Sequence, residues 1–238
     1  MKKVLSIFLA IAMTISLAAC GTSGTQDSSS GPSDQVTLGN STFEIETSGS
    51  ETSETGEGQD SSVLVAYFSW ADNAILADDV DVISSPSVTL PGNVQQLAGW
   101  VQEETGGDLF SIQVTDPYPS DWDECLSRAN QERGEDARPE LTANVANLEQ
   151  YDTVFLGYPN WWYGVPMALL SFLEQNDLSG KQVYLFCSHG TGGLARSVEI
   201  ITKAAPDAVI SDDIFDCYEE EAASSQSDIQ DWVAGLGY

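Results

Sequence analysis

Four aromatic side chains follow a short apolar segment, and together they could hold a flat ligand. The segment, residues 153–157, has the continuous apolar character of a strand buried on both faces. It passes into a loop that carries Tyr158, Trp161, Trp162 and Tyr163. Large apolar rings are unusual in an exposed turn, so we expect the loop either to bind a planar molecule or to pack as a local aromatic cluster. The residues alone leave both interpretations open.

A glycine-rich loop is the second segment with the residue types of a binding site. It runs Ser188-His189-Gly190-Thr191-Gly192-Gly193, directly after the apolar segment 181–187. Glycine lets a ligand approach the backbone closely and allows positive φ angles. His189 is the only histidine of the chain. It could be a ligand contact or proton donor, or a loop histidine bonded to backbone.

Other chemistries find little support in the sequence. Cys187 and His189 could pair as a thiol nucleophile and its base, but no acid that orients the histidine is identifiable. No Gly-x-Ser-x-Gly turn follows a strand, which argues against a serine hydrolase, and one histidine with scattered cysteines argues against structural zinc. The acidic run 78–81 could hold Ca²⁺, although it lacks EF-hand spacing and is more typical of a solvated turn. We therefore predict no metal site.

The start of the chain has the pattern of an exported protein. Met1-Lys2-Lys3 is basic, residues 4–17 are apolar but too few to span a membrane, and small residues lead into Cys20. This pattern resembles the lipobox of bacterial lipoproteins, which implies a signal peptide over residues 1–20 and lipidation of Cys20. The protein would then be extracytoplasmic and anchored to the bacterial cell membrane. The alternative is an ordinary secretory signal in which Cys20 is incidental.

Composition divides the remainder into a tether and one domain. Residues 21–61 are rich in Ser, Thr, Gly and acid, with few large apolar side chains, which predicts a disordered tether. Residues 62–238 have the size of a single domain. The formal net charge is −29, from 37 acidic and 8 basic residues, which makes nucleic acid an unexpected partner. Three cysteines of the domain, Cys125, Cys187 and Cys217, show no short-spaced pair, so we predict no structural disulfide.

Apolar periodicity along the domain predicts alternating strands and helices. The expected strands are residues 62–68, 109–114, 153–157, 181–187 and 208–211, and the expected helices are residues 93–105, 120–136, 165–176, 194–204 and 228–235. Asn93 and Ser120 are the expected N-caps of the first two helices. Such alternation predicts an α/β fold, a doubly wound five-stranded parallel sheet with helices on both faces. Ligands of such sheets bind beyond the carboxyl ends of the strands, where the aromatic and glycine-rich loops are expected.

Four segments in this order resemble the flavodoxin family, and most of all its exported, lipoprotein-type branch. They are Ala66-Tyr67-Phe68-Ser69, Gly92-Asn93-Val94, Gly157-Tyr158-Pro159-Asn160-Trp161-Trp162 and Phe186-Cys187-Ser188-His189-Gly190-Thr191-Gly192-Gly193. The resemblance covers residues 62–238. It implies a flavodoxin-like fold and FMN bound without a covalent link, so that the flavin itself carries the chemistry.

The resemblance also implies which residues hold the FMN. The phosphate would lie against the first loop and the start of the following helix, where helix N-termini favour anions without a cation. The ring would stack on the aromatic loop, and the glycine-rich loop would offer backbone groups to its edge. The implied cofactor-binding residues are Ser69, Trp70, Gly92, Asn93, Val94, Pro159, Asn160, Trp161, Trp162, Tyr163, Gly164, Ser188, His189, Gly190, Thr191, Gly192 and Gly193.

One insertion departs from the family pattern. Residues 70–91 separate Ser69 from Gly92, and Val94 stands where the family has a hydroxyl. The insert also carries carboxylates, which would repel a phosphate if they pointed inward. It either loops outward, closes over the site as a lid, or removes the affinity for FMN.

The expected function is therefore electron transfer or other flavin-dependent redox chemistry at the cell surface, with a redox protein or a small-molecule acceptor as partner. Two alternatives remain open. The domain could be a flavin-free binding module, or a flavin-dependent NAD(P)H reductase of quinone, nitro or azo compounds.

Overall fold

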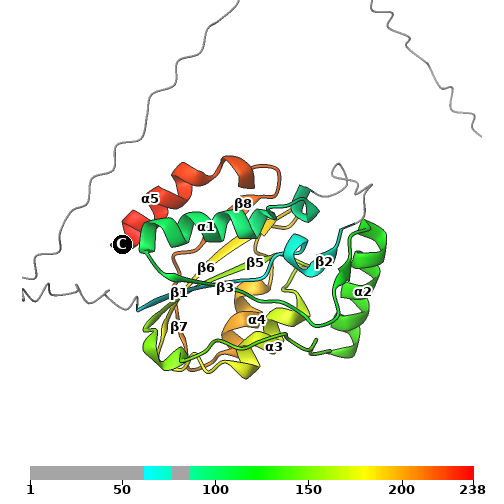
Figure 1. The fold of residues 1–238 in the computed structure, drawn as a ribbon, viewed down its shortest axis with the longest axis horizontal. Helices are drawn as coiled ribbons and strands as arrows, with labels where there is room; N and C mark the ends of the chain where they lie inside the picture. Colours follow the sequence, from blue (N-terminus) through cyan, green and yellow to red (C-terminus); the bar gives the residue numbers. More distant parts are fainter. Residues whose placement is uncertain (1–61, 77–85) are drawn as a thin grey trace, which may run out of the picture. The chain divides into compact units, whose positions relative to one another are not determined.

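A parallel β-sheet forms the centre of the domain (Figure 1). The computed structural model describes residues 62–76 and 86–238, all within the compact unit Thr55–Tyr238. The sheet has the order β3-β1-β5-β6-β7, and β8 also pairs with β6. Its strands are β1 (Val63–Tyr67), β3 (Asp108–Ser111), β5 (Thr153–Pro159), β6 (Gln182–His189), β7 (Val209–Ile210) and β8 (Phe215–Tyr218).

The last position of the sheet is shared by two short strands. The first half of β6 pairs with β7, through Gln182 and Val209. Its second half pairs with β8, through Phe186 and Phe215. All six strands pair in parallel, so the expected α/β fold with a parallel sheet is confirmed, although the sheet has six strands rather than five. The sequence analysis missed β8, because the polar residues 211–213 interrupt the apolar pattern.

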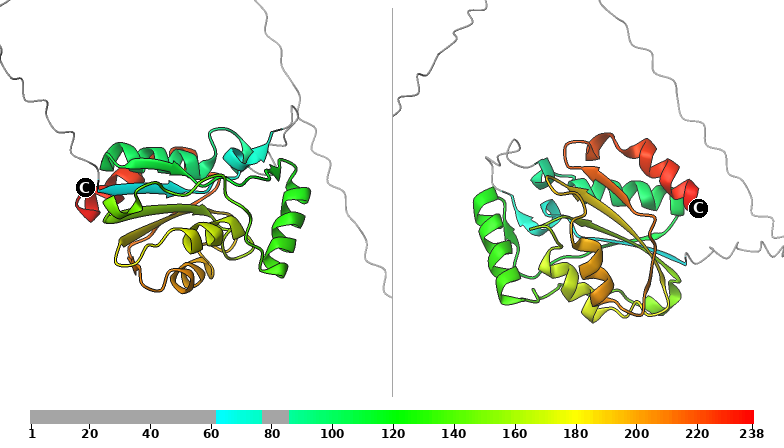
Figure 2. Two further views of the ribbon diagram at one scale, coloured as in Figure 1. Left: turned by 60° about the horizontal axis from the view of Figure 1, so that its bottom comes forward. Right: turned by 180° about the vertical axis from the view of Figure 1, so that it is seen from behind.

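Helices cover both faces of the sheet, as expected (Figure 2). One face packs against α1 (Asn93–Thr105) and α5 (Gln226–Leu236), and the other against α3 (Met167–Gln175) and α4 (Ser197–Ala204). The fifth helix, α2 (Trp122–Glu135), lies beyond the carboxyl ends of the strands in Figure 1. None of the helices described is both long and apolar enough to span a bilayer.

The predicted helices are all present, but several starts and caps differ; α3 and α5 start at Met167 and Gln226 rather than at 165 and 228. The N-cap of α1 is Gly92, whose N–H donates to the Gln95 side chain at 3.1 Å, and the expected cap Asn93 is already helical. The N-cap of α2 is Asp121, whose carboxylate accepts from the Glu124 N–H at 2.9 Å, so Ser120 lies outside the helix. Helix α4 starts at Ser197 rather than at 194, because Ala195 has a φ angle of 44°, which a right-handed α-helix does not accommodate.

The described residues of the 70–91 insert form short elements near the carboxyl ends of the sheet strands. A 3₁₀ turn (Ala71–Asn73) leads into β2 (Ala74–Ile75), which pairs in parallel with β4 (Tyr118–Pro119). A second turn (Pro86–Val88) precedes α1; the other 3₁₀ turns are Leu148–Gln150 and Ala222–Ser224. The run 78–81, considered for Ca²⁺, lies outside the described residues.

Candidate functional site

The two loops singled out in the sequence leave the sheet side by side. Strands β5 and β6 pair up to Pro159 and Ser188, so the aromatic loop and the glycine-rich loop start as neighbours. Strand β8 pairs with the end of β6 through Tyr218 and His189 and therefore brings a third loop to the same edge.

A groove of about 330 Å³ lies between these loops. Nine residues expected in the site line it: Pro159, Asn160, Trp161, Trp162, Tyr163, Ser188, His189, Gly190 and Thr191. Five residues that the sequence analysis missed complete the lining: Ser87, Trp122, Leu126, Tyr218 and Glu219. Trp122 is 41% exposed, and no sequence signal pointed to Tyr218 or Glu219.

The aromatic loop turns back on itself in a strained conformation. Trp161 and Gly164 form an antiparallel bridge, with the Gly164 N–H donating to the Trp161 carbonyl at 2.9 Å. Trp162 and Tyr163 between them have φ angles of 52° and 57°, a region that costs a non-glycine residue on the order of 1–3 kcal/mol. The surroundings hold Trp162 in place: its Nε1 donates to the Leu126 carbonyl at 3.2 Å, and Arg133 lies over its ring.

Trp161 belongs to an aromatic cluster beneath the groove. Its ring makes edge contacts with Phe68, Trp70 and Tyr118, at centroid distances of 5.5, 6.3 and 5.2 Å. Trp161 thus packs on other rings and also lines the groove. Tyr163, in contrast, is 58% exposed.

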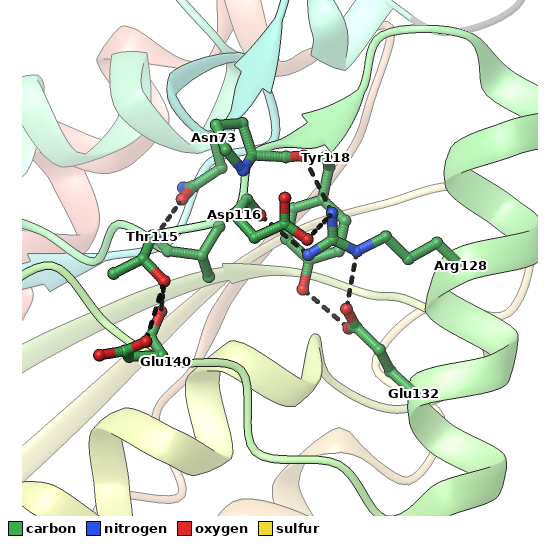
Figure 3. A network of polar contacts seen from close by, with 9 residues as sticks. Asn73, Thr115, Asp116, Tyr118, Arg128, Glu132 and Glu140 are labelled. Carbon is green, nitrogen blue, oxygen red and sulfur yellow. Dashed lines mark hydrogen bonds and ion pairs between the residues drawn. The ribbon is translucent and has the colours of Figure 1, made fainter.

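A buried polar network supports this cluster (Figure 3). The Tyr118 hydroxyl donates to Glu132 at 2.8 Å, and Arg128 donates to the same carboxylate at 2.9 Å. Arg128 also lies 4.1 Å from the centre of the Tyr118 ring. Burial, followed by the nearby Glu132, raises the pKa of Tyr118, so the hydroxyl remains a donor. The network ties α2 to β4 and so fixes the wall of the groove.

Asn73 links the insert to the main sheet. Its side chain donates to the carbonyls of Ser69 and Ile112, at 2.9 and 3.0 Å, and accepts from the Val114 N–H at 2.8 Å. Since all its partners are backbone groups, the side chain holds the end of β1 and the segment after β3 together by hydrogen bonds. The sequence analysis did not single it out.

The expected phosphate-binding residues lie buried beside the groove rather than in its lining. Ser69 is 1% exposed, and among residues 62–76 and 86–238 its hydroxyl finds no hydrogen-bond partner. Gly92 is packed directly against that hydroxyl: a Cβ on Gly92 would lie 2.1 Å from it. Asn93 donates to the Glu219 carbonyl at 2.9 Å and to the Ser188 hydroxyl at 3.4 Å, while Val94 packs in the core.

The remaining expected residues support the aromatic loop from two sides. Trp70 is 2% exposed, and its Nε1 donates to the Pro119 carbonyl at 3.0 Å. Gly192 lies against Tyr163, since a Cβ there would come within 2.7 Å of the ring. The Gly193 carbonyl accepts from the Asn160 side chain.

An acidic side chain of the insert points inward near the start of α1. Asp72 accepts from the Ser111 hydroxyl at 3.3 Å, and burial raises the pKa of its carboxyl. It also interacts with Tyr67, whose pKa burial raises to about 12. The carboxylates considered in the sequence analysis thus include one that does point inward.

His189 bonds both to backbone and to an acid. One ring nitrogen lies 3.0 Å from the Gly190 carbonyl, and Nε2 lies 2.8 Å from a carboxylate oxygen of Asp216 on β8. Asp216 is the orienting acid that the sequence could not identify. Cys187 is fully buried, and burial raises the pKa of its thiol well above the usual value, which argues against a nucleophilic role.

Neither metal ligands nor disulfides mark the site. Within residues 62–76 and 86–238, no three His, Cys, Asp or Glu side chains are grouped so that they could hold a metal ion. Cys125, Cys187 and Cys217 are buried free thiols.

Known proteins share this fold. A protein of Bacteroides eggerthii DSM 20697 assigned as a flavoprotein has 26% identity and a TM-score of 0.55, over 74% of this chain and 98% of its own. A second such protein, from Bacteroides uniformis ATCC 8492, has 23% identity and a TM-score of 0.56, over 72% of this chain and 97% of its own. A Lactobacillus acidophilus NCFM flavoprotein solved in complex with FMN has 15% identity and a TM-score of 0.50, over 69% of this chain and 97% of its own. At these low identities the last two show the fold alone.

The family comparison is decisive. Curated proteins offered no match, but the Flavodoxin_4 family model, described as flavodoxin, matches residues 82–236. In the order β3-β1-β5-β6-β7, the strand that follows β1 along the chain in this sheet, β3, lies at the edge next to β1. Flavodoxin-like domains have this strand order. The expected resemblance is confirmed: the chain belongs to the flavodoxin family.

Proposed function

We propose that the domain binds FMN without a covalent link at the groove and takes part in flavin-dependent redox chemistry. The groove itself carries the proposal. Its volume of about 330 Å³ lies in the range of small-molecule sites, and aromatic rings from one loop face glycine-rich backbone from the next strand. That combination suits a planar ring system with polar edges.

Each loop has a distinct part in holding the ring. Trp161, Trp162 and Tyr163 offer rings for stacking, and the strained turn presents the last two. Ser188–Thr191 would offer backbone and hydroxyl groups to the edge of the flavin. FMN, when bound, supplies the group that accepts and passes on electrons or hydride, while the protein orients it and excludes water.

Near the start of α1, one group would favour a bound phosphate and another would repel it. The unpartnered hydroxyl of Ser69, beside the N-cap Gly92, is a donor without an acceptor, and a helix N-terminus favours an anion. Asp72, whose pKa burial raises, would repel a phosphate in its charged form. Phosphate binding here needs the cap to open, since Ser69 and Gly92 are both buried.

The exposed rim of the groove favours exchange of electrons with an outside molecule. Trp122, Tyr163 and Tyr218 line the groove and are 41%, 58% and 40% exposed. A ring bound between them would remain accessible to a redox protein or a small acceptor. We therefore propose an electron carrier first; oxidation of NADH or NADPH by the FMN-loaded protein with a quinone would extend the role to that of a reductase.

A titration with FMN tests the proposal. The chain, purified in detergent, should quench FMN fluorescence and acquire the visible absorption of a bound flavin. Trp162→Leu should weaken binding, whereas Trp100→Leu, which alters a tryptophan on α1 away from the groove, should not. Protein that stays colourless and leaves FMN fluorescence unquenched would rule the proposal out.

We also propose that Cys20 is lipidated and anchors the protein outside the cytoplasm. The basic start, the apolar run 4–17 and the small residues before Cys20 support this. Cells fed a labelled fatty acid should incorporate it into the wild-type chain and not into Cys20→Ala. Equal labelling of both proteins would contradict the assignment.

A further inference from the structure

The basic side chains of this acidic protein are concentrated in one groove. Residues 62–238 contain six Lys and Arg residues in a chain of net charge −29. Four of them line a groove of about 420 Å³ formed by the end of α2, α3 and α4: Arg133, Arg138, Arg196 and Lys203. The other two serve local structure: Arg128 pairs with Asp116 and Glu132, and Lys181 donates to the Tyr151 carbonyl.

The floor of this basic groove is apolar. Met167 and Leu170 of α3 and Ile200 and Ala204 of α4 line it beneath the charged side chains. Met167 and Leu170 are themselves buried in the main core, so the floor is rigid. An apolar floor with a charged rim is the pattern of a site for an amphipathic small molecule.

Acids neutralise only part of the rim. Arg138 bonds to Asp136 at 2.8 Å and to Glu174 at 2.6 Å, so its charge is already compensated. Arg196 pairs with Glu199 at 3.2 Å, in a contact where both side chains are largely exposed.

Among the described residues, the two remaining cations are not held in an ion pair, although Lys203 joins Arg196 in lowering the pKa of Glu199. Neither Arg133 nor Lys203 forms an ion pair with any residue of the described part of the chain. Arg133 donates to the Asn130 side-chain oxygen at 3.0 Å and lies 5.3 Å from the centre of the Trp162 ring. The rim therefore offers positive charge on a surface that is otherwise strongly acidic.

The basic groove continues behind the aromatic loop. A second cavity of about 300 Å³ shares Arg133, Arg196 and most of the floor, and Trp161, Trp162 and Tyr163 line its far side. The backbone N–H of Arg196 also donates to the backbone carbonyl of Tyr163 at 3.2 Å. A ligand held by Arg133 would consequently lie next to the Trp162 ring.

We propose that the basic groove binds a small organic anion with an apolar body, that is, a carboxylate or sulfonate attached to an aromatic or aliphatic group. The acid group pairs with Arg133 and Lys203, and the apolar body covers the floor between α3 and α4. A bare inorganic anion would leave that floor in water. None of the four cations lines the flavin groove, which adjoins the basic groove only through the aromatic loop, so the inference stands whether or not FMN binds.

Anilinonaphthalene sulfonate, an aromatic sulfonate whose fluorescence increases in apolar surroundings, is a suitable probe. We expect saturable binding to the full chain that weakens with added salt, and a change in Trp162 fluorescence that is lost in Trp162→Phe. The double variant Arg133→Gln/Lys203→Gln should bind roughly fivefold more weakly, as expected for two partly exposed ion pairs. Glu199→Gln should strengthen binding, since it frees Arg196.

Controls separate the site from general stickiness and from the flavin groove. Lys181→Gln removes a positive charge outside the basic groove and should leave probe affinity unchanged. Octanoate should displace the probe, whereas FMN should not. Affinity that is insensitive to salt and to Arg133→Gln/Lys203→Gln would overturn the proposal, and so would displacement of the probe by FMN. Circular dichroism of each variant verifies that the fold is retained.

Discussion

The hydroxyl of Ser69 is buried with no hydrogen-bond partner in the described part of the chain, and it lies where a Cβ on Gly92 would come within 2.1 Å. The end of β1 and the N-cap of α1 are thus in direct contact, although the 70–91 insert separates them in the sequence. An unpaired buried hydroxyl costs on the order of 1–3 kcal/mol, so this contact is expected to lower the stability of the fold.

Substitutions at this contact should separate folding from binding. Ser69→Ala should leave the melting temperature unchanged or raise it, because it removes the unpaired hydroxyl, and it should weaken FMN binding if that hydroxyl donates to the phosphate. Gly92→Ala should destabilise the protein, and Ser69→Ala should partly relieve this in the double variant, since the two side chains clash. Thermal melts and FMN titrations of the three variants provide the cycle. A double variant whose destabilisation equals the sum of the single effects would contradict the contact.

Tyr163 should matter to the ligand more than to the fold. Its φ angle is 57° and its side chain is 58% exposed. Tyr163→Asn keeps a residue that tolerates this conformation, so the melting temperature should change little. Loss of the ring should raise the FMN dissociation constant about tenfold, the effect of a stacking contact of about 1.4 kcal/mol. Tyr163→Phe is the matched control and should bind normally; equal weakening in both variants would point to the hydroxyl instead.

Asp72 should make the protein less stable as the pH rises. Burial raises the pKa of its carboxyl, so the folded state binds the proton more tightly than the unfolded chain does. The free energy of unfolding should therefore decrease as the pH rises above the unfolded pKa of about 3.9. Asp72→Asn removes this penalty, and it should be more stable than wild type at pH 7 but not below about pH 4.

Guanidinium unfolding across this pH range measures the Asp72 effect. Asp231→Asn, on the exposed surface of α5, controls for the loss of one negative charge. A stability difference between Asp72→Asn and wild type that increases toward acid would have the wrong sign for this mechanism.

Glu219 should lower the reduction potential of FMN bound in the groove. It lines the groove, and its carboxylate lies within contact distance of a Cβ placed on Gly190. A nearby negative charge disfavours the added negative charge of the reduced flavin. Glu219→Gln should therefore shift the midpoint potential upward, whereas Asp231→Asn should leave it unchanged. Spectroelectrochemical titration measures both; a downward shift in Glu219→Gln would contradict the prediction.

Local sequence patterns were sufficient to predict the central strands of the sheet and both loops of the groove. The apolar runs at residues 153–157 and 181–187 predicted the central strands β5 and β6, since a strand buried on both faces needs an unbroken apolar run. The loops that follow adjacent parallel strands must meet at one edge. For that reason, nine expected residues line the same groove.

Long-range packing decided what local patterns could not express. Strand β8 is short and polar, and only its pairing with β6 identifies it as a strand. This pairing places Asp216 against His189, and it places Glu219 in the groove. Asn93 has the residue type of a helix cap, but it is the first helical residue, its amide donates to the Glu219 carbonyl, and Gly92 takes the cap position.

The sequence by itself determined the α/β alternation, the family and the loops that carry the candidate site. These depend on residue types and on spacing along the chain. Only the tertiary structure decided that the Ser69 hydroxyl is left without a partner and that four of six cations share one groove. Both outcomes depend on which distant segments touch, and that is set by packing of the whole core rather than by any one stretch of sequence.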